Sequence, residues 1–518
     1  MKQKLFFIFS LCFIELWLFT GCATNPVTGQ RELTLVSESQ EISIGQEHYG
    51  PSRQMQGGDY TIDPELTAYV STLGQKLAAV SDRNLPYEFV VLNNSVPNAW
   101  ALPGGKIAIN RGLLLELNNE AELTAVLGHE MVHAAARHGA KGMERGILLQ
   151  GAILATGIAI SGHEYANHVV GGAQLAATLV SQKYSRDAES EADYYGMTYM
   201  SRAGYDPKAA VALQETFVRL SENQRQDWLS GLFSSHPPSQ GRVDANRETL
   251  YVLPNKGELG VESYQKAIAG LKQNQPAYTA HDEGRKALNK GKLEEAEALA
   301  QKALKIEPRE AQFYALTGDI QLKKNQYQNA LNSYDRALER NNNFFYFYLQ
   351  RGLIQNKLNS QNSAKSDLEK SVSLLPTTVA YKTLGDIALA QGDRQSAMEY
   401  FKAAAGSQSE AGQQARQSLV RLDLPNNPHN YLKAETVLNP QGYVFVKIHN
   451  PTDVRVGDIA LLIRFLDASG QVRESVRNIP GTLAAGNTLS IPLDMGPVGD
   501  PSALNTIQLL VTRAAVVE

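Results

Sequence analysis

A regular spacing of small residues in the second half of the chain constrains its fold more than any other feature. Glycines separated by 34, 34 and 33 residues stand at positions 284, 318, 352 and 385. An alanine follows each glycine by twelve residues, at positions 296, 330, 364 and 397. Small residues at fixed positions let the two helices of a hairpin approach closely, and each hairpin then buries its apolar face against the next. The spacing therefore predicts four stacked helical hairpins.

A period of 34 residues is typical of tetratricopeptide (TPR) repeats, which form a superhelix with a groove for a protein partner. An irregular helical bundle is the alternative, but it does not explain four units in register. We expect an α-helical TPR superhelix over residues 277–423, entered through a linker helix over residues 256–276.

The residues after the repeats have the pattern of an all-β domain. Residues 424–518 contain short β-branched runs, such as GYVFVKIHN, separated by Gly, Pro, Asn and Asp. The alternation of Val444, Val446 and Ile448, and the DASGQ turn after Phe465, are typical of antiparallel strands. We expect a β-sandwich that serves as a binding or spacer domain and has no catalytic constellation.

The N-terminus has the pattern of a bacterial lipoprotein signal. The basic head MKQK precedes an apolar run that is too short for a stable membrane span and ends in TGC. This ending resembles a lipobox, in which the signal is cut before a cysteine that then carries lipid. We expect a signal peptide over residues 1–21 and lipidation of Cys22. A plain secretory signal or an uncleaved anchor is the alternative, because Phe19 and Glu15 depart from the usual pattern.

The same segment predicts where the protein works. Cys12 lies within the signal, so Cys22 is the only cysteine after cleavage and no intrachain disulfide is possible. Alanine rather than aspartate at position 23 favours sorting of lipoproteins to the outer membrane. We expect a periplasmic protein with a lipid anchor in the outer membrane of a Gram-negative bacterium. The net charge of −4 argues against a nucleic-acid partner.

A short motif in the first half of the chain contains residues that could bind a metal ion and act in catalysis. The stretch LGHEMVHAAARHG, residues 127–139, places His129 and His133 four residues apart. On a helix the two rings project from one face and can bind one metal ion. Glu130 is rotated away from that ion and can hold a water molecule as general base. A buried structural helix remains the alternative until a third ligand is identified.

The third ligand can be sought in two places. His138 follows His133 by five residues and not by the six of the metzincin pattern, so we interpret it as structural. The downstream stretch YSRDAESEADYYGM places Glu189 and Asp193 four residues apart. Glu189 would complete a His-His-Glu zinc site with one position open to water, and Asp193 would accept the free ring N–H of a ligand histidine. Glu191 is on the other side of that helix and is the weaker candidate.

The motifs HExxH, ESEAD and SSHPPSQGR, in this order, resemble those of the zinc peptidase family of HtpX and the CAAX prenyl endopeptidases. The segments NPVTGQRELTLVSESQE and NAWALPGGKIAINRGLL are similar to its soluble bacterial branch. With TPR repeats added, the architecture is similar to a periplasmic branch that handles misassembled outer-membrane proteins. The resemblance implies one Zn²⁺ ion per chain, with Glu130 as catalytic base and, as ligands, His129, His133 and Glu189.

The resemblance also implies a fold. We expect a multidomain chain with a mainly α zincin-like (gluzincin) peptidase domain that contains a small sheet. This domain is placed at residues 61–255, after a tether and first helix at residues 22–60. The TPR superhelix and the C-terminal all-β sandwich complete the chain.

Two residues of the SSHPPSQGR motif are candidates for a catalytic role. The two prolines after His236 restrict the backbone and fix the direction of its ring. We expect His236 and Arg242 to face the open side of the zinc, where either could stabilise the oxyanion of the reaction. Alternatively, His236 fills the water position and holds the enzyme inactive until substrate displaces it. A capped turn with a salt-bridged arginine is the structural alternative.

Two further segments bear on substrate access. KIAIN, residues 106–110, alternates as an edge strand with which an extended substrate could pair. The apolar stretch at residues 146–161 is shorter than the ~20 residues of a membrane span, so we expect a buried or lid-like helix over the cleft.

Together these features predict a zinc endopeptidase of the cell envelope that cleaves unfolded or misassembled envelope proteins in quality control. An edge-strand cleft accepts extended chain, and the TPR groove supplies a second protein-binding surface. The competing interpretation is a TPR-based periplasmic adaptor or chaperone with a dormant peptidase core. The intact HExxH motif, Glu189 and Asp193 favour the enzyme.

Overall fold

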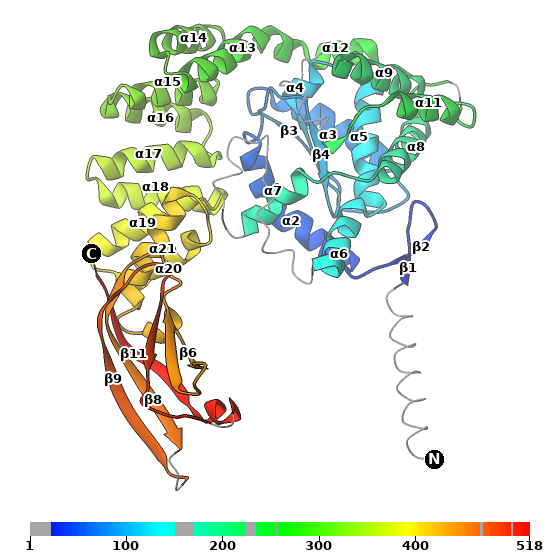
Figure 1. Ribbon diagram of the computed structural model, residues 1–518. Helices are drawn as coiled ribbons and strands as arrows, with labels where there is room; N and C mark the ends of the chain where they lie inside the picture. Colours follow the sequence, from blue (N-terminus) through cyan, green and yellow to red (C-terminus); the bar gives the residue numbers. More distant parts are fainter. Residues whose placement is uncertain are drawn as a thin grey trace, which may run out of the picture. The chain divides into compact units, whose positions relative to one another are not determined.

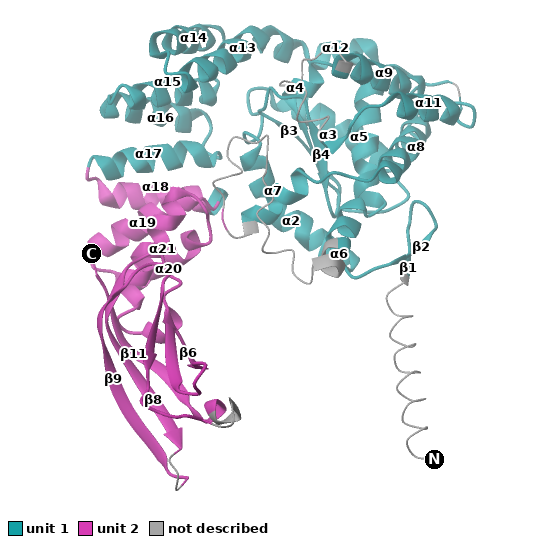
Figure 2. Cartoon of the chain, in the orientation of Figure 1, with its two compact units in different colours: residues 1–167, 172–358, 373–375 teal, residues 168–171, 359–372, 376–518 magenta. Residues whose placement is uncertain are grey.

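The computed structural model of the chain describes residues 22–150, 170, 172–222, 235–254, 256–466, 470–498 and 501–517 (Figure 1). The chain divides into two compact units (Figure 2), of which the first comprises residues 1–167, 172–358 and 373–375. The second comprises residues 168–171, 359–372 and 376–518. The predicted multidomain architecture is confirmed, since helices with a small sheet come first, helical repeats follow, and strands end the chain.

In the N-terminal part of the first unit, which ends before residue 255, helices surround a small sheet, and several of these helices begin at capping residues. Ser37 and Gln40 form a capping box, and Asn119 accepts a hydrogen bond from the backbone N–H of Glu122 at 2.9 Å. The elements are β1 (Cys22–Thr24), β2 (Arg31–Leu33), α2 (Glu38–Met55), α3 (Pro64–Ala78), β3 (Glu88–Leu92), β4 (Ala99–Leu102), β5 (Lys106–Asn110), α4 (Arg111–Leu114), α5 (Glu120–Ala135), α6 (His138–Gln150), α7 (Gly172–Val180), α8 (Arg186–Arg202), α9 (Lys208–Glu222) and α11 (Gln240–Thr249).

The KIAIN strand is the centre of the sheet and not its edge. The strand order is β3-β5-β4, with β3 parallel and β4 antiparallel to β5. All five residues of β5 are buried. Because both sides of β5 already pair with neighbours, the expectation that KIAIN forms an edge strand is wrong. Alternation along a strand does not reveal its place in the sheet, which depends on pairing with distant segments.

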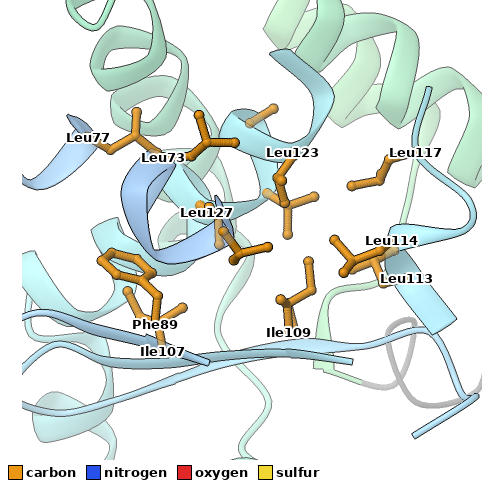
Figure 3. Packing of buried hydrophobic residues seen from close by; sticks show 14 of the residues in the cluster. Leu73, Leu77, Phe89, Ile107, Ile109, Leu113, Leu114, Leu117, Leu123 and Leu127 are labelled. Atoms are coloured by element: carbon orange, nitrogen blue, oxygen red, sulfur yellow. The ribbon is translucent and has the colours of Figure 1, made fainter. Parts of the chain in front are cut away.

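Helix α5, which carries the HExxH motif, packs against the sheet and against α3. Leucines of α3 and α5 and isoleucines of β5 form one buried apolar cluster (Figure 3). Burial of each such side chain stabilises the fold by about 1.5–3 kcal/mol. The labelled members on these three elements are Leu73, Leu77, Ile107, Ile109, Leu123 and Leu127.

Two glycines let helices α5 and α8 meet backbone to backbone. A β-carbon added at Gly128 would lie 3.0 Å from the carbonyl oxygen of Gly196. A β-carbon added at Gly196 would lie 2.9 Å from the backbone nitrogen of His129. No side chain fits in this crossing, and the close approach brings Glu189 and Asp193 of α8 beside the histidines of α5.

The segment at residues 22–37, which we expected to be a tether, lies against the end of α5. The side chain of Asn25 is buried and donates through Nδ2 to the carbonyl oxygen of Ala136 at 3.0 Å. Arg137 has a φ of 64°, and its guanidinium pairs with the buried carboxylate of Glu41. The N-terminal segment is therefore held on the helical core of the first unit from Asn25 onward.

Four helical hairpins follow, with small residues at their contacts as predicted. The repeat alanines at positions 296, 330, 364 and 397 are completely buried. A β-carbon at Gly318 would lie 2.8 Å from the ring of Tyr334, so only glycine fits there. The helices are α12 (Val261–Ala267), α13 (Ala269–Asn289), α14 (Leu293–Ile306), α15 (Ala311–Lys323), α16 (Tyr327–Arg340), α17 (Phe345–Lys357), α18 (Gln361–Leu374), α19 (Thr378–Ala390), α20 (Arg394–Ala405) and α21 (Glu410–Asp423).

The first repeats pack on the N-terminal part of the unit through hydrogen bonds between side-chain amides and backbone groups. Gln54 at the end of α2 donates to the carbonyl oxygen of Asn343 at 2.8 Å and accepts from the backbone N–H of Phe345 at 2.8 Å. Gln312 of α15 donates to the carbonyl oxygen of Gly57 at 3.0 Å. These bonds fix the repeats of the first unit to its N-terminal part.

The C-terminal strands form two three-stranded antiparallel sheets, in the orders β10-β7-β6 and β11-β8-β9. Residues from both sheets share one apolar core, in agreement with the predicted sandwich. The elements are η3 (Pro428–Asn430), β6 (Lys433–Leu438), β7 (Val444–His449), β8 (Val456–Leu466), β9 (Val472–Leu483), β10 (Thr488–Pro492), η4 (Pro501–Thr506) and β11 (Gln508–Val516).

Among the residues that the structure describes, no helix has the length and apolarity needed to cross a membrane. The predicted signal at residues 1–21 lies outside the described residues. So does most of the predicted lid-like helix, since residues 151–161 are not described.

Candidate metal centre

Helix α5 places the two histidines of the HExxH motif side by side. The Nε2 atoms of His129 and His133 lie 3.1 Å apart. The helix is regular from Glu120 to Ala135, so a separation of four residues puts both rings on one face. Two imidazole nitrogens therefore converge on one point in the protein interior.

Two further ligand groups reach the same point from other elements. Glu189 comes from the first turn of α8, and His236 from the segment before α11. His236 Nδ1 lies 3.0 Å from Glu189 Oε1 and 3.2 Å from His129 Nε2. One ligand atom from each residue of the cluster lies within 4.8 Å of the others, the four residues being His129, His133, Glu189 and His236.

Arg242, which we expected to face the open side of the zinc, lines a pocket together with His129, Glu130 and His236, and its guanidinium pairs with two carboxylates of the site. Its Nε and Nη2 atoms donate to the two carboxylate oxygens of Asp193, each at 2.7 Å. Its Nη1 atom lies 3.0 Å from Glu189 Oε2 and donates to the carbonyl oxygen of Pro237 at 3.2 Å. All three guanidinium nitrogens therefore contact protein groups, and Arg242 positions two carboxylates.

Each histidine of the HExxH motif has a partner on its outer ring nitrogen. His129 Nδ1 lies 2.9 Å from Asp193 Oδ1, the contact that we expected for one ligand histidine. His133 Nδ1 lies 2.9 Å from His138 Nδ1, and His138 Nε2 lies 3.1 Å from Glu191 Oε2. Such partners fix the tautomer and direction of a ligand ring.

His138 and Glu191, which the sequence does not favour as ligands, lie outside the group of four ligand residues. No sequence pattern indicates Tyr184, whose ring stacks on that of His133 with centroids 3.8 Å apart. Helix α5 ends at Ala135, and the chain turns through Arg137 in the left-handed region before α6 begins. The left-handed conformation of Arg137 brings the His138 ring back to His133. No local sequence pattern predicts this conformation for a residue other than glycine.

Glu130 lies beside the donor cluster with an unused acceptor. Its side chain is buried, and its Oε2 atom has no hydrogen-bond partner among the described residues. Its Oε1 atom lies 3.5 Å from His236 Nε2. A buried carboxylate oxygen without a donor is costly, by about 1–3 kcal/mol or more, so this atom is available to accept a hydrogen bond from a water molecule or another group bound in the site.

The electrostatics of the cluster favour a bound cation. Burial alone would lower the pKa of His129, but hydrogen bonds to Asp193 and Glu189 and their charges raise it to about 10. Burial lowers the pKa of His133 well below its ordinary value, and the positive charge of His129 lowers it further. The two carboxylates thus stabilise one positive charge among the imidazoles.

The donor set fits a transition-metal ion such as zinc. Imidazole nitrogens with one carboxylate oxygen are typical ligands of zinc, whereas calcium and magnesium prefer oxygen ligands alone. The buried, unpaired oxygen of Glu130 beside these donors is consistent with a metal site that also holds a reacting molecule.

Comparison with known proteins indicates the family to which the chain belongs. The family model described as peptidase family M48 matches residues 64–250, and a tetratricopeptide repeat model matches residues 281–343. The chain is 27% identical over 379 residues to the beta-barrel assembly-enhancing protease of Escherichia coli (strain K12). The alignment covers 65% of this chain and 76% of that protein.

Two other relatives are more similar in identity over shorter stretches of the chain. The mitochondrial metalloendopeptidase OMA1 of Schizosaccharomyces pombe is 32% identical over 243 residues, covering 45% of this chain and 68% of that protein. The putative beta-barrel assembly-enhancing protease of Vibrio cholerae is 32% identical over 203 residues, covering 37% and 40% of the two chains. The expected family resemblance is confirmed: the chain belongs to peptidase family M48 and carries tetratricopeptide repeats beside its peptidase domain.

Proposed function

We propose that this protein is a zinc-dependent endopeptidase in which His129, His133 and Glu189 hold one zinc ion and Glu130 is the general base. The observation that carries the proposal is the convergence of four ligand groups next to a buried glutamate with an unpaired oxygen. A bound zinc ion would supply Lewis-acid chemistry, which polarises a peptide carbonyl and makes water more acidic.

The residues around the ion would transfer protons and orient the ligand rings. Glu130 would take a proton from the attacking water and pass it to the leaving amine. Asp193, itself held by Arg242, would keep the His129 ring in the tautomer that presents Nε2. His138 would do the same for His133.

His236 has a separate role in this proposal. Its ring nitrogen lies among the ligand atoms, at 3.0 Å from Glu189 Oε1, which supports a position inside the coordination sphere. We propose that His236 occupies the place that water and substrate need, and that substrate must displace it. Stabilisation of the oxyanion by a displaced His236 is the second possibility for the same ring.

The N-terminal signal and the relatives support a proposal for the substrate and the location. We propose lipidation at Cys22, a periplasmic location at the outer membrane, and unfolded or misassembled envelope proteins as substrates. The name of the Escherichia coli relative, which describes the enhancement of β-barrel assembly, supports this class of substrate. A protein partner in the TPR groove would help to select it.

The first experiment uses the purified chain from residue 23 and its Glu130→Gln variant, each incubated with an unfolded outer-membrane protein. Zinc content is measured in both proteins, and fragments are followed by mass spectrometry. Cleavage by the parent alone supports the peptidase. Intact substrate in both samples, with zinc bound, would favour a TPR-based adaptor or chaperone with a dormant peptidase core, and the cellular function would then survive in the Glu130→Gln variant.

A further inference from the structure

A pocket opens beside His129 and Glu130, on the side of α5 that faces α9. It lies between α5, α8, α9 and α11, and it has about 50 Å³ of space for water centres. A single buried water needs roughly 10–15 Å³ by the same measure, so the pocket has room for a side chain of medium size. Its apolar walls come from Val126, Met197, Ala210, Leu213 and Phe217.

Helix α9 supplies one wall of this pocket with a single polar residue. Ala210, Leu213, Gln214 and Phe217 follow one another at helical spacing, so they share one face. Gln214 is 9% exposed, and its Oε1 atom has no hydrogen-bond partner among the described residues. An amide oxygen in this environment is costly to bury without a donor, and a bound side chain with a donor group would supply it.

The kind of side chain that would pair with the amide of Gln214 can be narrowed down. A primary amide has both a donor and an acceptor, so a second amide complements it whichever way either group is turned. A carboxylate would lack the donor and would also lie near the carboxylates of Glu130 and Asp193, which line the same pocket. An apolar side chain would fit the walls but would leave Gln214 Oε1 without a donor.

We propose that this pocket takes a substrate side chain with an apolar stem and a terminal amide, that of glutamine, next to the scissile bond. The inference rests on the proposed function, because it is Glu130 that makes the neighbouring peptide bond the one that is cut. It assigns Gln214 as the residue that determines specificity at this position.

The test compares two sets of three peptides, and each set varies one position only. A peptide that spans a cut site in an unfolded substrate is the parent, and an unstructured peptide of that substrate serves where no cut is found. The residues on each side of the cut, or two adjacent central residues of the uncut peptide, are replaced in turn by glutamine, methionine and glutamate. These side chains have similar lengths. The ratio of kcat/KM between peptides is taken within each enzyme, so that a general loss of activity in a variant cancels.

The parent enzyme is expected to prefer glutamine over methionine by about 5- to 100-fold at one of the two positions, and to cleave the glutamate peptide least. Gln214→Leu is expected to reverse the order of glutamine and methionine. The control Gln240→Leu changes an exposed glutamine of α11 outside the pocket and is expected to keep the parent order.

Binding to the zinc-loaded Glu130→Gln variant, followed by calorimetry, separates this inference from the proposed function. Cleavage with no glutamine preference at either position, or with the same preference in Gln214→Leu, overturns the pocket assignment and leaves the peptidase intact. Absence of cleavage with glutamine-selective binding overturns the peptidase and supports the pocket. Absence of both cleavage and selective binding overturns both.

Discussion

The Nδ1 atoms of His133 and His138 lie 2.9 Å apart in the protein interior. Two ring nitrogens at this distance share one proton, so one is the donor and the other the acceptor. His138 Nε2 lies 3.1 Å from Glu191 Oε2, and this carboxylate requires a proton on Nε2. Burial lowers the pKa of His138 and so favours the neutral ring, which leaves its Nδ1 as the acceptor. His133 then carries its proton on Nδ1 and presents the Nε2 lone pair to the donor cluster.

Replacement of His138 by alanine is therefore expected to weaken zinc binding about 10- to 100-fold, because the His133 ring loses the group that fixes its tautomer. His138→Gln keeps an acceptor and should recover part of the affinity. Zinc dissociation constants are measured by competition with a chelator, with circular dichroism as the check on folding. An unchanged zinc affinity in the folded alanine variant would show that His138 has only a structural role.

Arg242→Lys should reduce both zinc affinity and kcat/KM, the latter by about 10- to 100-fold. An ammonium group cannot make the paired contacts that the guanidinium makes with Asp193 while also reaching Glu189. The matched control is Arg247→Lys on the same helix, where the arginine side chain is 52% exposed and its ion pairs are worth about 0–1 kcal/mol. Equal behaviour of the two variants would contradict the positioning role of Arg242.

His236→Ala tests whether that ring blocks the site. Because His236 Nδ1 lies among the ligand atoms, we expect its removal to raise the rate at which an unfolded substrate is cleaved. Initial rates at matched zinc occupancy give the comparison. A fall in rate would instead favour stabilisation of the oxyanion, and an unchanged rate would leave His236 as part of a capped turn.

Gln54→Ala should loosen the contact between the repeats and the peptidase core. The amide of Gln54 donates to the backbone oxygen of Asn343 and accepts from the backbone N–H of Phe345. Its loss leaves the buried N–H of Phe345 without that acceptor. The expected cost is about 1–3 kcal/mol, observed as faster hydrogen exchange of the Phe345 amide and a lower unfolding temperature. Gln46→Ala, at an exposed position of the same helix, is the control and should change neither quantity. Exchange at Phe345 that matches the parent protein would show that other contacts hold the repeats.

The sequence by itself determined the features that depend on spacing within a few residues. Four glycines and four alanines at a period of about 34 residues predicted the repeats, and the structure has them in that register. A separation of four residues predicted that His129 and His133 share a helix face, because helical geometry repeats every 3.6 residues. The family motifs predicted membership of a zinc peptidase family.

Only the tertiary structure decided which distant groups meet. The place of KIAIN at the centre of the sheet depends on pairing with two other strands, and the crossing at Gly128 and Gly196 brings α8 to the histidines. The direction of Arg242, the contact of His138 with His133, and the pocket at Gln214 likewise depend on separate helices packed together. Local periodicity encodes the face that a residue occupies, whereas the neighbour on that face is fixed by close packing of the whole domain.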